Sequence, residues 1–165
     1  MTTIRNYMNR KIFVERFFFY CCLALLIVLG TGATLNATEA KMPVAKFGDN
    51  KVKLEVADTE AKIERGLMFR TSLEKDSGMV FLFDPHRKVK FWMFNCFIPL
   101  DMIFIRDGKV AKIAENVPPC KSKNPRECPT YPEEAVDVDK VVEVNAGYCK
   151  KHGIKEGDSV EFSFQ

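Results

Sequence analysis

The chain has only one tryptophan and two histidines among its 165 residues. It also has no apolar run of the length that an ordinary transmembrane helix needs. Its longest such run, residues 17–29, is shorter than the ~20 residues that span a bilayer. No internal repeat, long low-complexity tract or second-domain linker interrupts the rest. These absences favour one domain of ordinary size.

An excess of charge of one sign is also lacking. Four of the 25 basic residues and two of the 22 acidic residues lie in residues 1–40, which leaves 21 and 20, a net charge of +1. A domain with balanced charge gives no electrostatic reason to bind nucleic acid or an anionic membrane. We therefore expect neither as a partner of the domain.

The N-terminus has the features of an export signal. Its basic residues are Arg5, Arg10, Lys11 and Arg16. The apolar run 17–29 follows them, and small residues at 31–33 come next. A basic start, a short apolar segment and a small-residue cleavage site are typical of secretory signals. Tyr20 stands before Cys21 where a lipoprotein has a small residue, so we expect no lipidation.

The predicted organisation is a signal peptide at 1–33, a tether at 34–49 and a single domain at 50–165. This places the protein outside the cytoplasm, in the periplasm or a similar compartment. The alternative is a signal that is never cleaved, in which case residues 17–29 anchor the protein. The N-terminal segment is then its sole membrane contact.

Four cysteines lie beyond the predicted signal: Cys96, Cys120, Cys128 and Cys149. An even number in an exported chain suggests disulfides. Cys120 and Cys128 flank a polar, proline-rich loop, and closing so short a loop contributes roughly 2–3 kcal/mol. We predict this disulfide. Zinc is the alternative, but the spacing is wide for a zinc knuckle and neither His86 nor His152 is nearby in sequence.

The pattern of apolar residues predicts a mostly β domain. Seven segments read as strands: 51–56, 79–83, 89–94, 100–105, 109–114, 138–144 and 159–164. Asp107-Gly108 is typical of a tight hairpin. One short helix is expected after Asp58 or Thr59, running to Arg65, and another at residues 145–151. Many short strands and two helices indicate a closed or sandwich-like β domain, with the helices capping its ends.

Residues 91–105 contain the only tryptophan, Trp92, and two polar residues in otherwise apolar runs, Asn95 and Asp101. Such residues are costly to bury unless they are hydrogen-bonded. One interpretation is that Trp92 is a core aromatic while Asn95 and Asp101 hold the bend at Pro99. The other is a small polar pocket with Trp92 as its floor.

The chain resembles the domain of unknown function 192 family, whose members are often exported. The motifs that carry the resemblance are Arg65-Gly66-Leu67-Met68-Phe69-Arg70, Gly78-Met79-Val80-Phe81, Phe91-Trp92-Met93, Ile98-Pro99-Leu100-Asp101-Met102, Pro118-Pro119-Cys120, Asn145-Ala146-Gly147 and His152-Gly153. They occur in order from about residue 44 to the C-terminus. The resemblance implies a compact, mostly β, jelly-roll-like domain and no established reaction. This chain departs from the family pattern at Cys96 and Cys149, which suggests that these two cysteines pair.

The candidate contact residues lie in or near these motifs. The main candidates for ligand contact are Trp92, Asn95 and Asp101, together with Arg65 and Arg70. Second-rank candidates are Glu115 and Asn145. The planar guanidinium of arginine suits carboxylate or phosphate. The alternative for Arg65 and Arg70 is an internal ion pair with Asp101 or Glu115 that stabilises the fold.

The sequence predicts a domain that binds a small ligand or a component of the cell envelope. One alternative is an envelope hydrolase that uses Asp101 with Glu115, or Cys96. A second is a structural protein-interaction domain. Copper bound by Met68, Met79, Met93 and Met102 is disfavoured, because each lies in an apolar run where methionine fills core gaps. We expect no metal and no cofactor, and assign no catalytic residue.

Overall fold

The computed structural model describes residues 42–164. The predicted signal peptide, the alternative anchor at 17–29 and the first part of the predicted tether lie outside the described residues. Within residues 42–164, no helix is long and apolar enough to cross a membrane.

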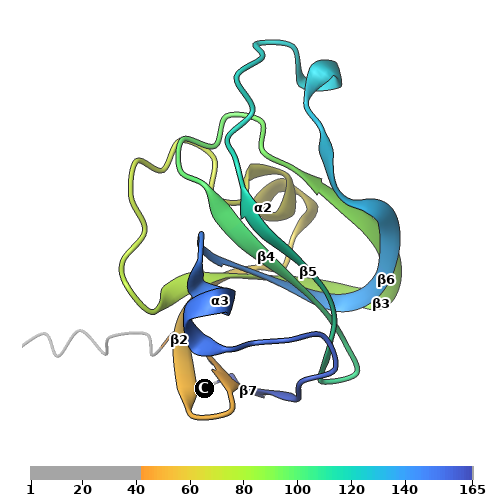
Figure 1. The fold of residues 1–165 in the computed structure, drawn as a ribbon. Coiled ribbons are helices and arrows are strands. Elements are labelled where there is room, and N and C mark those ends of the chain that lie inside the picture. The colour runs from red at the N-terminus through yellow and green to blue at the C-terminus, as the bar shows by residue number, and fades with distance from the viewer. Residues whose placement is uncertain (1–41, 165) are drawn as a thin grey trace, which may run out of the picture. The chain divides into compact units, whose positions relative to one another are not determined.

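Seven strands form one curled sheet, which confirms a mostly β fold (Figure 1). They are β1 (Val44–Phe47), β2 (Asn50–Ala57), β3 (Ser77–Trp92), β4 (Leu100–Arg106), β5 (Lys109–Val117), β6 (Thr130–Asn145) and β7 (Val160–Ser163). Their order across the sheet is β5-β4-β6-β3-β2-β1-β7. Among these neighbours β2 and β3 are parallel, and every other pair is antiparallel.

The domain begins before residue 50. Strand β1 pairs with both β2 and β7. Its residues Ala45 and Phe47 are buried in the core. The boundary between tether and domain that the sequence placed at residue 50 therefore falls inside the sheet, and the second part of the predicted tether is a strand.

Strands β3 and β6 are longer than the sequence pattern indicated. The two predicted segments 79–83 and 89–94 are parts of one strand, which runs through Asp84-Pro85. Its register against β6 shifts between Leu82 and Arg87, where proline cannot donate a ladder hydrogen bond. We predicted a strand end at this dipeptide, but it is an irregularity inside a continuous strand. The pair curves around one side of the domain (Figure 1).

Within residues 42–164 two short α-helices are present, as predicted. Helix α2 (Glu60–Arg65) is capped by Thr59, whose hydroxyl accepts a hydrogen bond from the Lys62 backbone N–H at 3.4 Å. Helix α3 (Tyr148–His152) ends at Gly153, which has a φ of 65°. The one-turn 3-10 helix η1 (Pro125–Glu127) lies in the proline-rich loop. The Asp107-Gly108 hairpin is also present, with positive φ at both residues.

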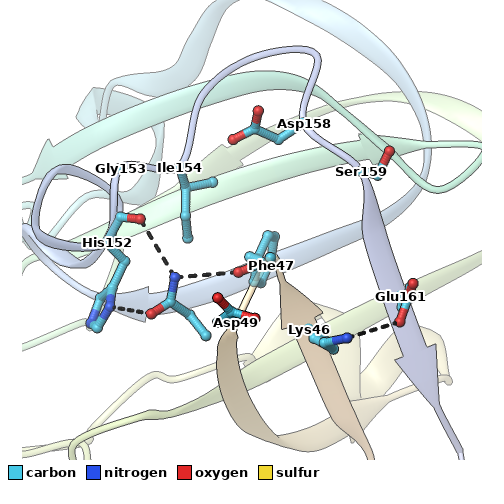
Figure 2. Close-up of a pocket in the computed structure, with 11 residues that line it drawn as sticks. Lys46, Phe47, Asp49, His152, Gly153, Ile154, Asp158, Ser159 and Glu161 are labelled. Atoms are coloured by element: carbon cyan, nitrogen blue, oxygen red, sulfur yellow. Dashed lines mark hydrogen bonds and ion pairs between the residues drawn. The ribbon is translucent and has the colours of Figure 1, made fainter.

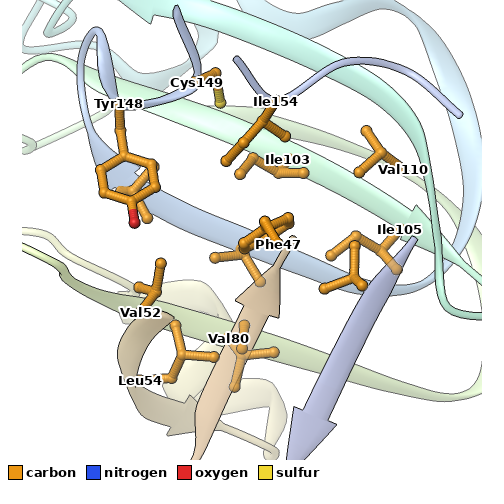
Figure 3. Packing of buried hydrophobic residues seen from close by; sticks show 14 residues of the cluster. Phe47, Val52, Leu54, Val80, Ile103, Ile105, Val110, Tyr148, Cys149 and Ile154 are labelled. Atoms are coloured by element: carbon orange, nitrogen blue, oxygen red, sulfur yellow. The ribbon is translucent and has the colours of Figure 1, made fainter. Parts of the chain in front are cut away.

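Alternate residues of the central strands face two separate hydrophobic clusters. The first, shown in Figure 3, includes Val80, Ile103 and Cys149. The second includes Phe81, Met102, Phe104, Val141 and Cys96. Because neighbouring residues of a strand point to opposite faces, one sheet supplies both clusters.

The four cysteines of the described residues form one disulfide and leave two free thiols. Cys120 and Cys128 form the predicted disulfide. The suggested pairing of Cys96 with Cys149 is wrong, because both are free and buried. The physical reason is that they belong to different hydrophobic clusters of the sheet.

Candidate functional site

Asp101 is fully buried, and its carboxylate is bonded to the backbone of two distant segments. Oδ1 accepts from the N–H groups of Asn116 at 2.8 Å and Gly147 at 3.0 Å. Oδ2 accepts from the N–H of Cys149 at 2.8 Å. Its side chain is 0% exposed. Asp101 therefore joins the end of β5 and the start of α3 to β4. The sequence suggested instead that Asp101 holds the bend at Pro99, and these hydrogen bonds do not involve that bend.

The other predicted contact residues do not gather around Asp101. Arg70 donates from Nη2 to Glu55 Oε2 at 2.7 Å on the surface, so it pairs with neither of the two carboxylates suggested for it. Asn145 donates from Nδ2 to the carbonyls of Leu73 and Glu74, both at 3.2 Å, and holds that loop. Glu115 is exposed.

Asn95 lies in a tight turn that joins two loops. The Cys96 N–H donates to the Met93 carbonyl at 3.3 Å, and Asn95 has a φ of 55°. Its carbonyl accepts from the N–H of Phe69 at 2.8 Å, and Phe69 itself has a φ of 65°. Asparagine tolerates this conformation, whereas for a bulky phenylalanine it is unusual. The backbone of Asn95 thus connects the loop after α2 to the loop after β3.

A small cavity of about 30 Å³ lies between these two loops and the sheet. Its outer end is lined by exposed residues, Glu64, Arg65 and Trp92. Its inner lining comprises Phe81, Phe91, Phe94, Cys96 and Glu143, together with Ile63 and residues 66–68. The volume has room for about two water molecules.

Gly66 lets the loop after α2 approach the sheet at this cavity. It has a φ of 43°. A Cβ added there would lie 3.2 Å from Cζ of the Phe81 ring. Glycine alone meets both requirements easily, because it has no side chain. The motif that marked the family resemblance therefore shapes one wall of the cavity.

Glu143 is the polar group at the inner end of the cavity. It stands on β6 opposite Met79 of β3 and Met102 of β4, and its side chain is only 4% exposed. Within residues 42–164, no group donates a hydrogen bond to its carboxyl or forms an ion pair with it. Burial raises its pKa from 4.5 to about 8, so the carboxyl is mostly protonated at neutral pH.

The Cys96 thiol shares this cavity with Glu143. Burial, followed by the nearby carboxyl of Glu143, raises the thiol pKa to about 12. A thiol with that pKa is protonated at neutral pH and is a poor nucleophile. Without a ligand, the cavity therefore contains an uncharged acid and an uncharged thiol among aromatic rings, and neither group is a strong nucleophile.

Of the predicted residues, the structure brings Trp92 and Arg65 to this cavity and places Asn95 in the turn beside it. Glu143 was missed. The signal for it was available, because Val141-Val142-Glu143-Val144 sets one acid inside a β-branched run. This is the same anomaly that singled out Asp101.

A larger, open hollow of about 540 Å³ lies beside His152 (Figure 2). Several of its polar side chains are paired, although the buried Nε2 of His152 has no hydrogen-bond partner within residues 42–164. Lys46 and Glu161 form an ion pair at 3.6 Å. Asn50 donates from Nδ2 to the carbonyls of Phe47 and His152, so its Oδ1 accepts from His152 Nδ1 at 2.7 Å. These bonds join β1, β2 and α3, and we interpret this hollow as structural.

The described residues contain no cluster of three or more histidine, cysteine, aspartate or glutamate side chains placed to hold a metal ion. The four methionines suggested as copper ligands are divided by their surroundings. Met79, Met93 and Met102 are buried in the second hydrophobic cluster, and Met68 packs against it. They fill space in the core, as methionine usually does.

The fold and cavity define a small β domain built on one curled sheet, with an aromatic-walled cavity over one face. Within that class, the model of the DUF192 family, described as "Uncharacterized ACR, COG1430", matches residues 43–162. The chain therefore belongs to this family, which confirms the resemblance drawn from its motifs. No protein with a curated description matches the chain.

Two solved structures are similar to this domain. One is a protein of unknown function from Novosphingobium aromaticivorans DSM 12444, with 37% identity and a TM-score of 0.62, covering 72% of this chain and 83% of that chain. The other, from Sinorhizobium meliloti 1021, is described as a candidate transcription regulator. It has 34% identity and a TM-score of 0.61, covering 73% of this chain and 91% of that chain.

Proposed function

We propose that this protein is an exported small-ligand-binding protein and that its ligand enters the cavity beside Trp92. The observation that carries the proposal is the carboxyl of Glu143, a residue only 4% exposed, which lines the cavity and forms no hydrogen bond or ion pair within residues 42–164. Buried polar groups are nearly always hydrogen-bonded, and an unpartnered one is expensive to bury. A ligand group that bonds to Glu143 explains why the fold retains it.

The surroundings of the cavity support this function. Trp92 is 36% exposed, and its ring lies 5.6 Å from that of Phe94. Phe69 and Phe97 form an edge-to-face pair at 6.0 Å, and each is more than half exposed. These rings lie on the two loops that the Asn95 carbonyl joins. Ligand sites combine aromatic walls with a few placed polar groups, as this cavity does.

Export is part of the proposal because of the N-terminal pattern of basic, apolar and small residues. The disulfide between Cys120 and Cys128 is consistent with an oxidising compartment. A ligand of this protein is then a molecule of the cell envelope or the medium.

The alternatives have less support. In the hydrolase hypothesis Asp101 is an acid or base, but its carboxylate is buried and accepts hydrogen bonds from three backbone amides. The Cys96 thiol is protonated at neutral pH. A role as a transcription regulator, suggested by the description of the Sinorhizobium protein, gains no support from the charge, because the predicted domain carries almost no net charge to attract nucleic acid.

A thermal-shift screen of the purified protein against sugars, envelope fragments, nucleotides, small acids, amines and metals tests the proposal. A ligand at ~100 times its dissociation constant adds about 2.7 kcal/mol, which is several degrees for a domain of this size. We expect Trp92→Ala to abolish the shift. Phe164→Ala, which removes an exposed aromatic outside the cavity lining, is the matched control and should retain it.

The proposal fails if no compound stabilises the wild-type protein, or if the stabilisation survives Trp92→Ala unchanged. Failure of the screen would favour the structural alternative. In that case the exposed pair of Phe69 and Phe97 would be the first surface to test for a protein partner.

A further inference from the structure

The cavity is selective in chemistry as well as in size. Its inner end offers one carboxyl, on Glu143, and one thiol, on Cys96, surrounded by phenylalanine rings. The carboxyl has no hydrogen bond or ion pair within residues 42–164. The missing partner of a carboxylate is a donor, and a positively charged donor forms the strongest such bond.

Aromatic rings favour the same kind of ligand. The face of an aromatic ring is electrically negative and attracts cations, most strongly when water is excluded. Phe81, Phe91, Phe94 and Trp92 all line this cavity. An anion at the same place would meet the negative faces of these rings, and it would repel Glu143 whenever that carboxyl is ionised. A cation would meet favourable groups on several sides.

Size limits the cation. A cavity of about 30 Å³ holds about two waters, so it admits an ammonium or methylammonium head but not a sugar ring or a phosphate with its oxygens. The remainder of the ligand must lie outward, past the exposed residues Glu64, Arg65 and Trp92.

We infer that the cavity binds the ammonium head of an organic amine, with Glu143 as its counter-ion and the surrounding rings as its walls. This inference rests on the proposed function and names the ligand class of the same site. Glu143 takes the carboxylate form when the amine enters, so its proton leaves to solvent, and the buried charge is then paired with the ammonium group.

The other ionisable groups around Glu143 set the background for this exchange. Across the sheet it faces Met79 and Met102, which do not titrate. The Cys96 thiol, with its pKa raised to about 12, stays neutral between pH 6 and 9. Glu64 and Arg65 line the outer end of the cavity, where they are exposed and carry opposite charges. Glu143 is therefore the group around the cavity that changes charge in this range.

Trp92 makes the inference directly measurable, because it is the only tryptophan of the chain and stands at the cavity. We would titrate the purified protein with n-butylammonium and follow Trp92 fluorescence at constant ionic strength. Butyrate and butanol, of similar size, are the anionic and neutral probes. An alkylammonium ion stays charged to about pH 10, so only the protein titrates between pH 6 and 9.

We expect a saturable response to butylammonium alone. Its affinity should rise about tenfold per pH unit from pH 6 to about 8 and then level, because binding needs the carboxylate of Glu143. Glu143→Gln should weaken binding at least tenfold, while Glu115→Gln, which removes an exposed acid outside the cavity lining, should change it less than threefold.

The pH profile of the wild-type protein tests the inference even if Glu143→Gln does not fold. An affinity that falls or stays flat with rising pH overturns it, as does stronger binding of butyrate or butanol. Saturable binding of those probes would leave the proposed function intact and discard the amine. Silence towards butylammonium overturns the inference, whereas the proposed function is judged by the wider screen and its Trp92 dependence.

Discussion

Two acidic residues buried on neighbouring strands, Asp101 of β4 and Glu143 of β6, differ in their hydrogen bonding. Asp101 is 0% exposed and accepts three backbone N–H bonds. Glu143 is 4% exposed and receives none within residues 42–164. Burial of an acid therefore says little about its role until its partners are known. The satisfied acid holds the fold together, whereas the unsatisfied one is the group on which the proposed ligand site rests.

The largest expected effect is a pH dependence of stability that Glu143 causes. Its pKa is raised from 4.5 to about 8, so the folded protein holds a proton that the unfolded chain releases. The stabilisation is complete below pH 4.5 and is lost as the pH rises to about 8. A shift of this size corresponds to about 5 kcal/mol.

Urea unfolding at intervals from pH 5 to 9 measures this dependence. The difference in unfolding free energy between wild type and Glu143→Gln should change steadily up to about pH 8 and then remain constant. Glu64→Gln, an exposed acid near the same cavity, should run parallel to wild type. Parallel curves for Glu143→Gln would mean that this carboxyl is satisfied after all, and the contrast with Asp101 would disappear.

Removing the satisfied acid comes next. Asp101→Ala leaves the N–H groups of Asn116, Gly147 and Cys149 without their acceptor and should cost about 3–5 kcal/mol. Urea unfolding at pH 7 measures it. Glu115→Ala, at an exposed position on β5, is the control and should stay within about 0.5 kcal/mol. A loss at Asp101 below about 1 kcal/mol would contradict its structural role.

A smaller effect on stability is expected at Gly78 of β3, which lies against the backbone of Glu143. A Cβ added there would lie 2.3 Å from the carbonyl oxygen of Glu143, so β3 or β6 must move aside. We expect Gly78→Ala to cost about 1–3 kcal/mol in thermal unfolding. Ser77→Ala, one residue earlier, is the control. A neutral Gly78→Ala would show that the backbone of Glu143 is free to move, which would weaken the claim that its carboxyl is held at the cavity.

The smallest effect concerns Arg70, for which the sequence suggested an ion pair with Asp101 or Glu115. Its observed partner is Glu55, on the surface, and exposed pairs contribute at most about 1 kcal/mol. Arg70→Met should therefore shift the melting temperature only slightly, and Glu55→Gln should shift it by a similar amount. A sharp loss of stability in Arg70→Met alone would restore the idea of an internal pair.

Local patterns predicted much of the fold. The hairpin at Asp107-Gly108 and the Thr59 cap are fixed by neighbouring residues, and both are present. The disulfide between Cys120 and Cys128 closes a short loop and was likewise predictable. The continuity of β3 through Asp84-Pro85 was not, because the partner strand that keeps it extended lies far along the chain. The same holds for β1, whose partners are β2 and β7.

Only part of the cavity was accessible to the same reasoning. Trp92, Arg65 and Asn95 were singled out because they lie in motifs that break an apolar run or flank a glycine, but the turn that Asn95 forms was not predicted. The suggested pair of Cys96 and Cys149 failed because sequence gives no distance between residues on different faces of a sheet.

By itself, the sequence determined that this is a mostly β domain of its family, with one short disulfide loop and lone acids inside apolar runs. Asp101 and Glu143 give the same signal at that level. The tertiary structure alone decided between them, because the three amides that satisfy Asp101 come from residues 116, 147 and 149, while the surroundings of Glu143 are rings and a thiol. A lone acid in an apolar run can be recognised from the local sequence, but folding decides which hydrogen-bond partners surround it.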